Sequence, residues 1–117
     1  MQFDFETFST LAARAYEQGP YTLEEAEGVF WYYFLRYEVK FGRAHPRIRM
    51  EQIRHIMRIM PYIDQKSIGG YLADVEPECY KDMIDQHFRT AYRNCDYNIN
   101  HFFSGKVREL RWYETCY

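Results

Sequence analysis

The chain has 117 residues, a hydrophobic fraction of 47%, a charged fraction of 27% and a formal net charge of −2. This length suits one domain spanning residues 1–117, large enough to bury roughly two thirds of the surface that its unfolded chain exposes. The composition excludes a disordered or low-complexity chain, and the longest uncharged apolar run is far shorter than the ~20 residues of a membrane-spanning helix.

Cysteine usage and the absence of a secretory pattern indicate the compartment. No charged start leads into an apolar segment with a small-residue cleavage site, so we expect a cytoplasmic protein. Cys79, Cys95 and Cys116 share no close paired spacing. An odd number of unpaired cysteines favours reduced thiols over a disulfide framework.

Charge is distributed unevenly along the chain. Residues 1–29 hold six acids against one base, whereas residues 36–58 hold seven bases against two acids. Such blocks are typical of solvated helix faces that pair within the fold. The alternative is that residues 36–58 form a functional basic patch.

A first helix is predicted to begin after Asp4, which has the side chain of an N-cap residue. Phe3 and Phe8 occupy the two positions of a hydrophobic staple around that cap. Apolar residues at helical spacing continue the helix until Gly19 and Pro20 end it.

A second helix is predicted from a capping box, Thr22 with Glu25, to about Gly42. Its apolar residues fall on two faces. The predicted core face is a stripe about 100° wide made of Leu23, Ala26, Phe30, Tyr33, Phe34, Tyr37 and Phe41. The nearly opposite face holds Gly28, Tyr32, Leu35 and Val39, with Trp31 beside them. Two apolar faces indicate either a central helix packed between neighbours or a helix whose second face meets another chain.

A third helix is predicted over residues 47–60, where Pro61 ends it. One face is apolar, and the other carries charged residues at spacings of four, three and four: Arg47, Glu51, Arg54 and Arg58. If Glu51 pairs with a neighbouring arginine, this is an ordinary solvated face. The alternative is a basic surface, extended by Lys40 and Arg43, that binds phosphates or carboxylates.

The next segment, residues 62–75, contains a Gly69-Gly70 break and is predicted to form a loop, with a short strand as the alternative. Pro77 is well placed as the first residue of a fourth helix that extends to about Arg93. A short capped helix is expected in the stretch DYNINHFFSG, ending at Gly105.

The final segment, residues 106–117, fits two periods. Val107, Leu110, Glu114 and Tyr117 suit one face of a helix, whereas Leu110 and Trp112 on either side of Arg111 suit a strand. We favour the helix. The sequence therefore predicts a mainly α fold, a compact single-domain bundle of five or six helices with an aromatic core, and a short C-terminal strand or hairpin is the alternative.

Motifs for catalysis are weak. Gly69-Gly70 lacks the Lys-Ser/Thr of a phosphate-binding loop, and no G-x-S-x-G elbow is present. His87, Cys95 and His101 give the spacing H-x7-C-x5-H, which matches no standard zinc site. We interpret His87 as a packed core histidine and expect no enzyme activity, no cofactor and no bound metal.

Two stretches, CDYNINHFFSG and VRELRWYETCY, make up the last quarter of the chain. In these stretches, and in its aromatic-rich α pattern, the sequence resembles small uncharacterised accessory proteins of bacterial phages and mobile elements. The resemblance implies a context and assigns no functional residue. Such proteins often act without catalysis, by binding DNA or by blocking a host nuclease complex such as a CRISPR effector.

We therefore expect a non-enzymatic binding module of a phage or mobile element with a protein or nucleoprotein partner, and inhibition of a host nucleic-acid-handling complex is its specific form. The runner-up is a regulatory protein that binds nucleic acid directly through residues 36–58, although such domains are usually clearly basic. The third class is a homo-oligomeric structural protein. Candidate partner-binding residues are Trp31, Tyr32, Leu35, Lys40, Arg43, Arg47, Arg54 and Arg58.

A helix-turn-helix fits the chain poorly. About fifteen residues separate Pro61 from Pro77, whereas the turn of that motif takes three or four. A winged variant that uses the C-terminal segment as a hairpin remains an alternative, although the acidic face of the fourth helix would repel a duplex.

Overall fold

The computed structural model describes residues 4–64 and 72–116, and over these ranges it contains six helices and one two-stranded antiparallel sheet. The helices are α1 (Phe5–Ala15), α2 (Leu23–Phe41), α3 (Met50–Ile59), α4 (Cys79–Arg89), α5 (Ile99–Phe102) and α6 (Gly105–Thr115). The strands are β1 (Tyr62–Asp64) and β2 (Leu72–Asp74). The predicted mainly α fold with an aromatic core is confirmed.

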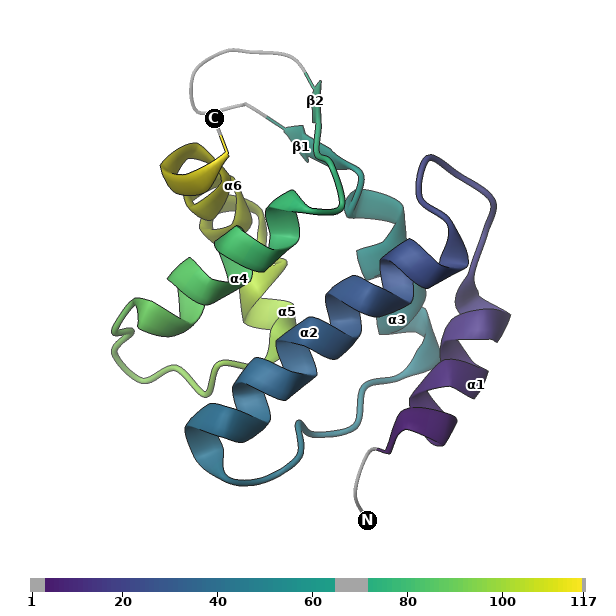
Figure 1. The fold of residues 1–117 in the computed structure, drawn as a ribbon, viewed down its shortest axis with the longest axis horizontal. Coiled ribbons are helices and arrows are strands. Elements are labelled where there is room, and N and C mark those ends of the chain that lie inside the picture. The colour runs from purple at the N-terminus through teal and green to yellow at the C-terminus, as the bar shows by residue number, and fades with distance from the viewer. Residues whose placement is uncertain (1–3, 65–71, 117) are drawn as a thin grey trace.

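The long helix α2 runs through the middle of the molecule (Figure 1). α1 and α3 lie on one side of α2, whereas α4, α5 and α6 lie on the other, and the small sheet closes one end. In the described part of the chain, no helix combines the length and apolarity needed to cross a lipid bilayer.

Local caps set the ends of α2 as the sequence predicts. Thr22 and Glu25 make both hydrogen bonds of the capping box. At the other end, Gly42 adopts a left-handed conformation with φ 70°, which glycine takes without steric cost. Asp4 caps α1 by accepting a hydrogen bond from a backbone N–H in the first turn, while the expected staple residue Phe3 lies outside the described residues.

Three helices are shorter than predicted at one end. α1 ends at Ala15 rather than at Gly19 and Pro20, because Tyr16 is extended, and this leaves Glu17 in the α1–α2 connection. α3 begins at Met50 rather than at residue 47, because Arg49 is extended and its N–H is capped by the Gln52 side chain. Arg47 therefore precedes the helix. α4 ends at Arg89 instead of Arg93, since the next residue is extended while its N–H still bonds to the last turn.

The segment after α3 forms a strand pair, which confirms the short-strand alternative for that segment. Ile63 of β1 pairs with Ala73 of β2 in antiparallel register. The predicted Gly69-Gly70 break lies outside the described residues. The sheet is thus in the middle of the sequence, and residues 105–115 are helical, so the C-terminal strand alternative is wrong.

The face that α6 buries differs from the prediction. Leu110 is 51% exposed, whereas Arg108, Arg111 and Trp112 are buried. Arg108 is accommodated because its guanidinium donates hydrogen bonds to the Ile59 carbonyl oxygen at 3.0 Å and to the Tyr80 hydroxyl at 2.9 Å. Gly105, the expected end of the preceding short helix, instead begins α6.

Aromatic rings of α2 make the centre of the core and confirm its predicted inner face. Tyr33 is fully buried, and its ring centroid lies 4.9 Å from that of Phe88 and 5.6 Å from that of Phe102. On the α1 side, the ring of Phe8 packs on Phe30 at 5.1 Å. α2 therefore joins the two halves of the bundle through one continuous set of rings.

Buried tyrosine hydroxyls connect these rings to the chain between helices. The Tyr33 hydroxyl donates to the Tyr97 carbonyl oxygen at 2.6 Å, and the Tyr80 hydroxyl donates to the Met60 carbonyl oxygen at 2.5 Å. Tyr97 lies in the α4–α5 connection and Met60 caps the end of α3. Each ring therefore positions a connection as well as filling the core.

Two histidines are buried as neutral groups. His45 Nδ1 donates to the Pro46 carbonyl oxygen at 2.8 Å, and its Nε2 accepts from the Ile99 backbone N–H at 2.9 Å. His87 is fully buried with Nδ1 3.2 Å from the Tyr92 hydroxyl oxygen, which confirms it as a packed core histidine. Burial is the main cause that lowers the pKa of His45 to about 4 and that of His87 to about 3.

The free energy of unfolding should therefore fall as the pH drops from about 6.5 to about 4. Histidines of the unfolded chain take up protons near pH 6.5, whereas His45 and His87 resist protonation until about pH 4 and 3. The unfolded state binds more protons in this window. The free energy of unfolding therefore falls by about 1.4 kcal/mol for each pH unit and each histidine. Urea denaturation at a series of pH values measures the slope of the unfolding free energy against pH.

His87→Phe removes one of these two groups and should reduce the slope by about half. The exposed His55 offers a matched control, because His55→Gln should keep the wild-type slope. A His87→Phe variant with an unchanged slope would contradict the assignment.

Candidate functional site

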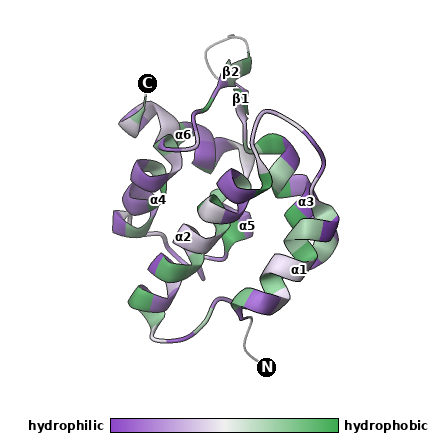
Figure 2. Ribbon diagram, turned by 45° about the vertical axis from the view of Figure 1, so that its right-hand side comes forward, coloured by the Kyte–Doolittle hydropathy of each residue, from purple (hydrophilic) through white to green (hydrophobic). Residues whose placement is uncertain are grey.

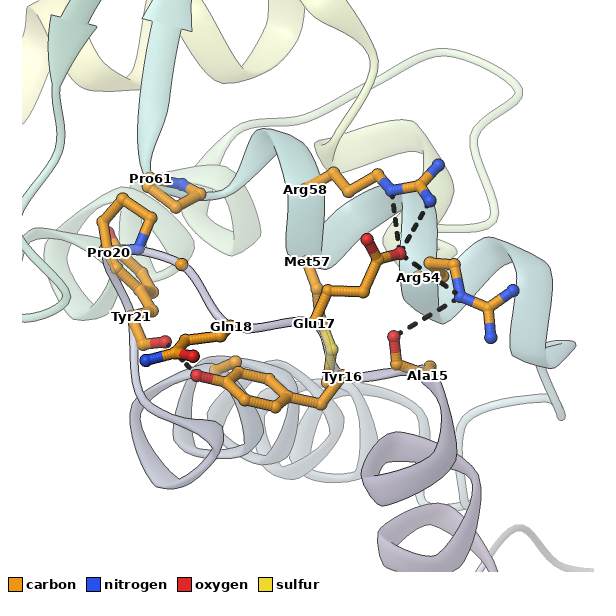
Figure 3. Close-up of a pocket in the computed structure, with 12 residues that line it drawn as sticks. Ala15, Tyr16, Glu17, Gln18, Pro20, Tyr21, Arg54, Met57, Arg58 and Pro61 are labelled. Atoms are coloured by element: carbon orange, nitrogen blue, oxygen red, sulfur yellow. Dashed lines mark hydrogen bonds and ion pairs between the residues drawn. The ribbon is translucent and has the colours of Figure 1, made fainter.

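Arg54 and Arg58 of α3 share one carboxylate, that of Glu17 in the α1–α2 connection (Figure 3). Glu17 Oε1 accepts from Arg58 Nη2 at 2.6 Å and lies 3.6 Å from Arg54 Nε. The same Arg54 Nε donates to the Ala15 carbonyl oxygen at 3.4 Å. Whereas the sequence suggested Glu51 as the partner, the carboxylate comes from 41 positions away from Arg58.

A hollow of about 200 Å³ lies beside this ion pair. In Figure 3, Glu17 stands between the two arginines and the side chains of Pro20 and Tyr21. The Tyr16 hydroxyl is already used, because it donates to the Tyr21 carbonyl oxygen at 2.7 Å. Small-molecule sites usually enclose roughly 300–1,000 Å³ with several converging polar groups, so this hollow is a poor ligand site.

The other basic candidates lie apart from this ion pair. Lys40 and Arg43 both lie over the Phe41 ring, with Lys40 Nζ 5.9 Å and the Arg43 guanidinium 5.3 Å from its centroid, and Lys40 Nζ is 4.7 Å from the centroid of the Tyr97 ring. Arg47 precedes α3 and borders a hollow along α1. The predicted arginine face of α3 is therefore shorter than expected, because Arg47, one of its three arginines, lies before the helix begins.

The second face of α2 is exposed rather than packed between neighbouring helices. Leu35 is 55% exposed, Val39 is 71% exposed and Trp31 is 37% exposed. α4 packs along the Tyr32 edge, where the Tyr32 hydroxyl donates to Asp85 at 2.5 Å. The interpretation of α2 as a helix buried on both apolar faces is therefore wrong.

One residue of α1 extends this exposed face. Phe5 is 51% exposed, and its ring meets Trp31 edge-on with centroids 4.9 Å apart. Trp31 also packs against Phe8 at 6.2 Å and Phe34 at 5.9 Å, which fixes its ring. We call the four exposed residues the exposed stripe: Phe5, Trp31, Leu35 and Val39.

Acidic side chains border the exposed stripe. Glu24 and Glu27 precede Trp31 by two turns and one turn of α2, and Glu38 follows Leu35 by three residues. Asp85 and Asp82 of α4 lie on the Tyr32 side. Figure 2 shows hydrophilic residues in the first turns of α2 and alternating hydrophobic and hydrophilic residues toward its C-terminal end. The stripe is therefore an apolar surface whose border is acidic along the edge that carries Glu24, Glu27 and Glu38. On the Tyr32 side Asp85 is paired with Arg36, and Arg47 lies near Phe5.

Cys95 makes a contact that the sequence reasoning missed. Its Sγ lies 3.1 Å from His101 Nδ1 and accepts from the Tyr97 backbone N–H at 3.2 Å. The H-x7-C-x5-H spacing was the available signal. The distance between Cys95 Sγ and His101 Nδ1 is short enough for a nucleophile and its general base. Within the described residues, however, no carboxylate hydrogen-bonds to His101 to orient its ring. The same part of the chain holds no group of three or more His, Cys, Asp or Glu that could bind a metal ion.

Comparisons with known proteins give no match among family models, curated proteins or solved structures.

The Glu17–Arg58 pair should contribute little to stability. Their side chains are 54% and 61% exposed, and exposed ion pairs typically contribute about 0.2–1 kcal/mol. A double-mutant cycle with Glu17→Ala and Arg58→Ala, followed by urea denaturation, should give a coupling energy in this range that shrinks at high salt. Arg43→Ala is the control, since it should be additive with Glu17→Ala. A coupling above about 2 kcal/mol would contradict this view of the pair as a surface contact.

Proposed function

We propose that this chain is a non-enzymatic binding module whose exposed stripe docks on a partner protein. The observation that carries the proposal is the contiguous exposure of Phe5, Trp31, Leu35 and Val39 on two well-packed helices. Contiguous exposed apolar residues mark interaction sites, whereas single ones are common on any surface. Tryptophan is also enriched among the residues that dominate binding energy.

The acidic border favours one kind of partner, a protein with an apolar patch flanked by lysine or arginine. Complementary charges around an apolar centre accelerate association and suppress wrong partners. The same border repels phosphates, which disfavours nucleic acid at this face. A second copy of the chain is also disfavoured, because a two-fold contact would bring the two acidic borders together.

Direct nucleic-acid binding through residues 36–58 has less support. Arg36 pairs with Asp85 at 3.3 Å, and both Arg54 and Arg58 pair with Glu17. Phosphates would have to compete with these carboxylates. The charges of Arg36, Arg54 and Arg58 are therefore better explained as pairing within the fold.

The specific form of the proposal is a cytoplasmic inhibitor of a host complex that handles nucleic acid. The resemblance of the last quarter of the chain to accessory proteins of phages and mobile elements supports a host target. A CRISPR effector is one such complex, and its protein subunits carry basic surfaces that bind nucleic acid. Those surfaces have the charge that the border of the exposed stripe requires.

Leu35→Glu should abolish partner binding and leave the fold intact. Substitutions at exposed positions usually change stability by no more than about 0.5 kcal/mol, whereas a charge in an apolar contact is costly. Leu110→Glu is the matched control, because it makes the same change at an equally exposed leucine on α6. Thermal unfolding of both variants should coincide with wild type.

The binding test uses tagged protein in lysate of a bacterial host, with and without nuclease treatment, followed by purification of the captured protein. Titration should then show direct binding by wild type and Leu110→Glu and at least a tenfold loss for Leu35→Glu. Three results would overturn the proposal. They are undiminished binding by Leu35→Glu, capture that nuclease abolishes, and a wild-type dimer in light scattering that Leu35→Glu converts to a monomer.

A further inference from the structure

The start of α4 and the end of α6 bring two cysteines together. Cys79 is the first residue of α4, and Cys116 is the C-cap of α6. α6 packs against α4 (Figure 1). As a result, the Cys116 thiol donates to the Cys79 carbonyl oxygen with an Sγ–O distance of 3.6 Å, although the residues are 37 positions apart.

The two thiol groups also interact with each other. Burial, and after it a hydrogen bond with the Cys116 thiol, raises the pKa of the Cys79 thiol to about 11. Both cysteines are free and half-buried, so each retains a path to solvent. Two free cysteines from different helices are therefore neighbours in the α4–α6 packing, where Cys116 Sγ lies 3.6 Å from the Cys79 carbonyl oxygen.

We propose that Cys79 and Cys116 are a redox pair that closes into an intramolecular disulfide between α4 and α6. The proposal does not depend on the exposed stripe or on any partner. It also revises the expectation from cysteine spacing, because the pairing is between helix ends that are adjacent in the fold and distant in the sequence.

The oxidant that the step requires is a low-molecular-weight disulfide such as oxidised glutathione. The Cys116 thiolate attacks one sulfur of glutathione disulfide, which forms a mixed disulfide and releases one glutathione thiolate. Cys79 then loses its proton and its sulfur attacks the Cys116 sulfur, which releases the second glutathione. Two cysteine thiols are oxidised to one disulfide, and one glutathione disulfide is reduced to two thiols.

The environment of Cys79 favours one order of these attacks. Little of a thiol with a pKa of about 11 is deprotonated at pH 7. This low thiolate fraction favours Cys79 as the resolving thiol, and either order of attack gives the same disulfide. Once the mixed disulfide has formed, the contact between the two side chains makes the second step intramolecular and therefore fast.

Cys95 provides an internal comparison. Its thiol contacts the His101 ring and a backbone N–H rather than another thiol. Glutathione can therefore form an adduct at Cys95, but the second step to a protein disulfide has no partner there. The expected disulfide is specific to one of the three pairings that three cysteines allow.

The sequence makes the pairing straightforward to identify by mass spectrometry. Trypsin cleavage places the three cysteines on separate peptides, residues 67–81, 94–106 and 112–117. The protein is equilibrated in glutathione buffers of rising oxidised fraction, quenched with acid, alkylated and digested without reductant. The expected product joins peptides 67–81 and 112–117, weighs two hydrogens less than their sum, and disappears on reduction.

Thermal unfolding gives an independent readout. Closing a loop of this length should raise the melting temperature by about 10 °C. Cys95→Ser should keep both the joined peptide and the shift, whereas Cys79→Ser and Cys116→Ser should lose both. The proposal fails if wild type yields a bond to peptide 94–106, bonds between chains, or glutathione adducts without the joined peptide.

Discussion

Buried tyrosine hydroxyls have to find acceptors inside this protein, and two of them use main-chain carbonyls at a helix end and in a connection between helices. Tyr80 donates to Met60 at the end of α3, and Tyr33 donates to Tyr97 between α4 and α5. Leaving such a hydroxyl unpaired would cost about 1–3 kcal/mol. Because each ring is also packed in the core, one hydrogen bond fixes both a helix and a connection. The positions of α3, α4 and α5 around α2 depend on these bonds.

The same constraint explains why α6 packs with arginine inward. The Arg108 guanidinium reaches the Tyr80 hydroxyl and the Ile59 carbonyl oxygen, so it adds donors where α3 ends. Its Cζ lies 5.8 Å from the centroid of the Phe103 ring. One guanidinium nitrogen, Nη1, reaches both acceptors, whereas Arg108 Nε is buried without a hydrogen-bond partner among the described residues. Leu110, which has no donor to offer, faces solvent instead.

Local sequence signals were sufficient to predict the ends of α2. They were insufficient to predict which candidate surfaces are exposed. The capping box at Thr22 and the glycine at position 42 involve neighbours within one turn, so their spacing predicts both ends of the helix. The partner of Arg58 lies 41 positions away, and no spacing rule reaches that far. Exposure of Leu35 depended on where α4 packs, and the inward face of α6 depended on acceptors supplied by α3. Apolar periodicity predicts that a face is apolar, and tertiary packing decides whether it is covered.

The exposed stripe is well suited to binding because its packing against the core already restricts the motion of its side chains. Trp31 is fixed by ring contacts with Phe5, Phe8 and Phe34, so little side-chain entropy remains to be lost on association. Leu35 lies one turn further along the same helix, on the face opposite to the rings that join the two halves of the bundle. A partner would therefore meet a rigid apolar ridge. The acidic border would then mainly set the association rate, and the rigid apolar centre would mainly set how long the complex lasts.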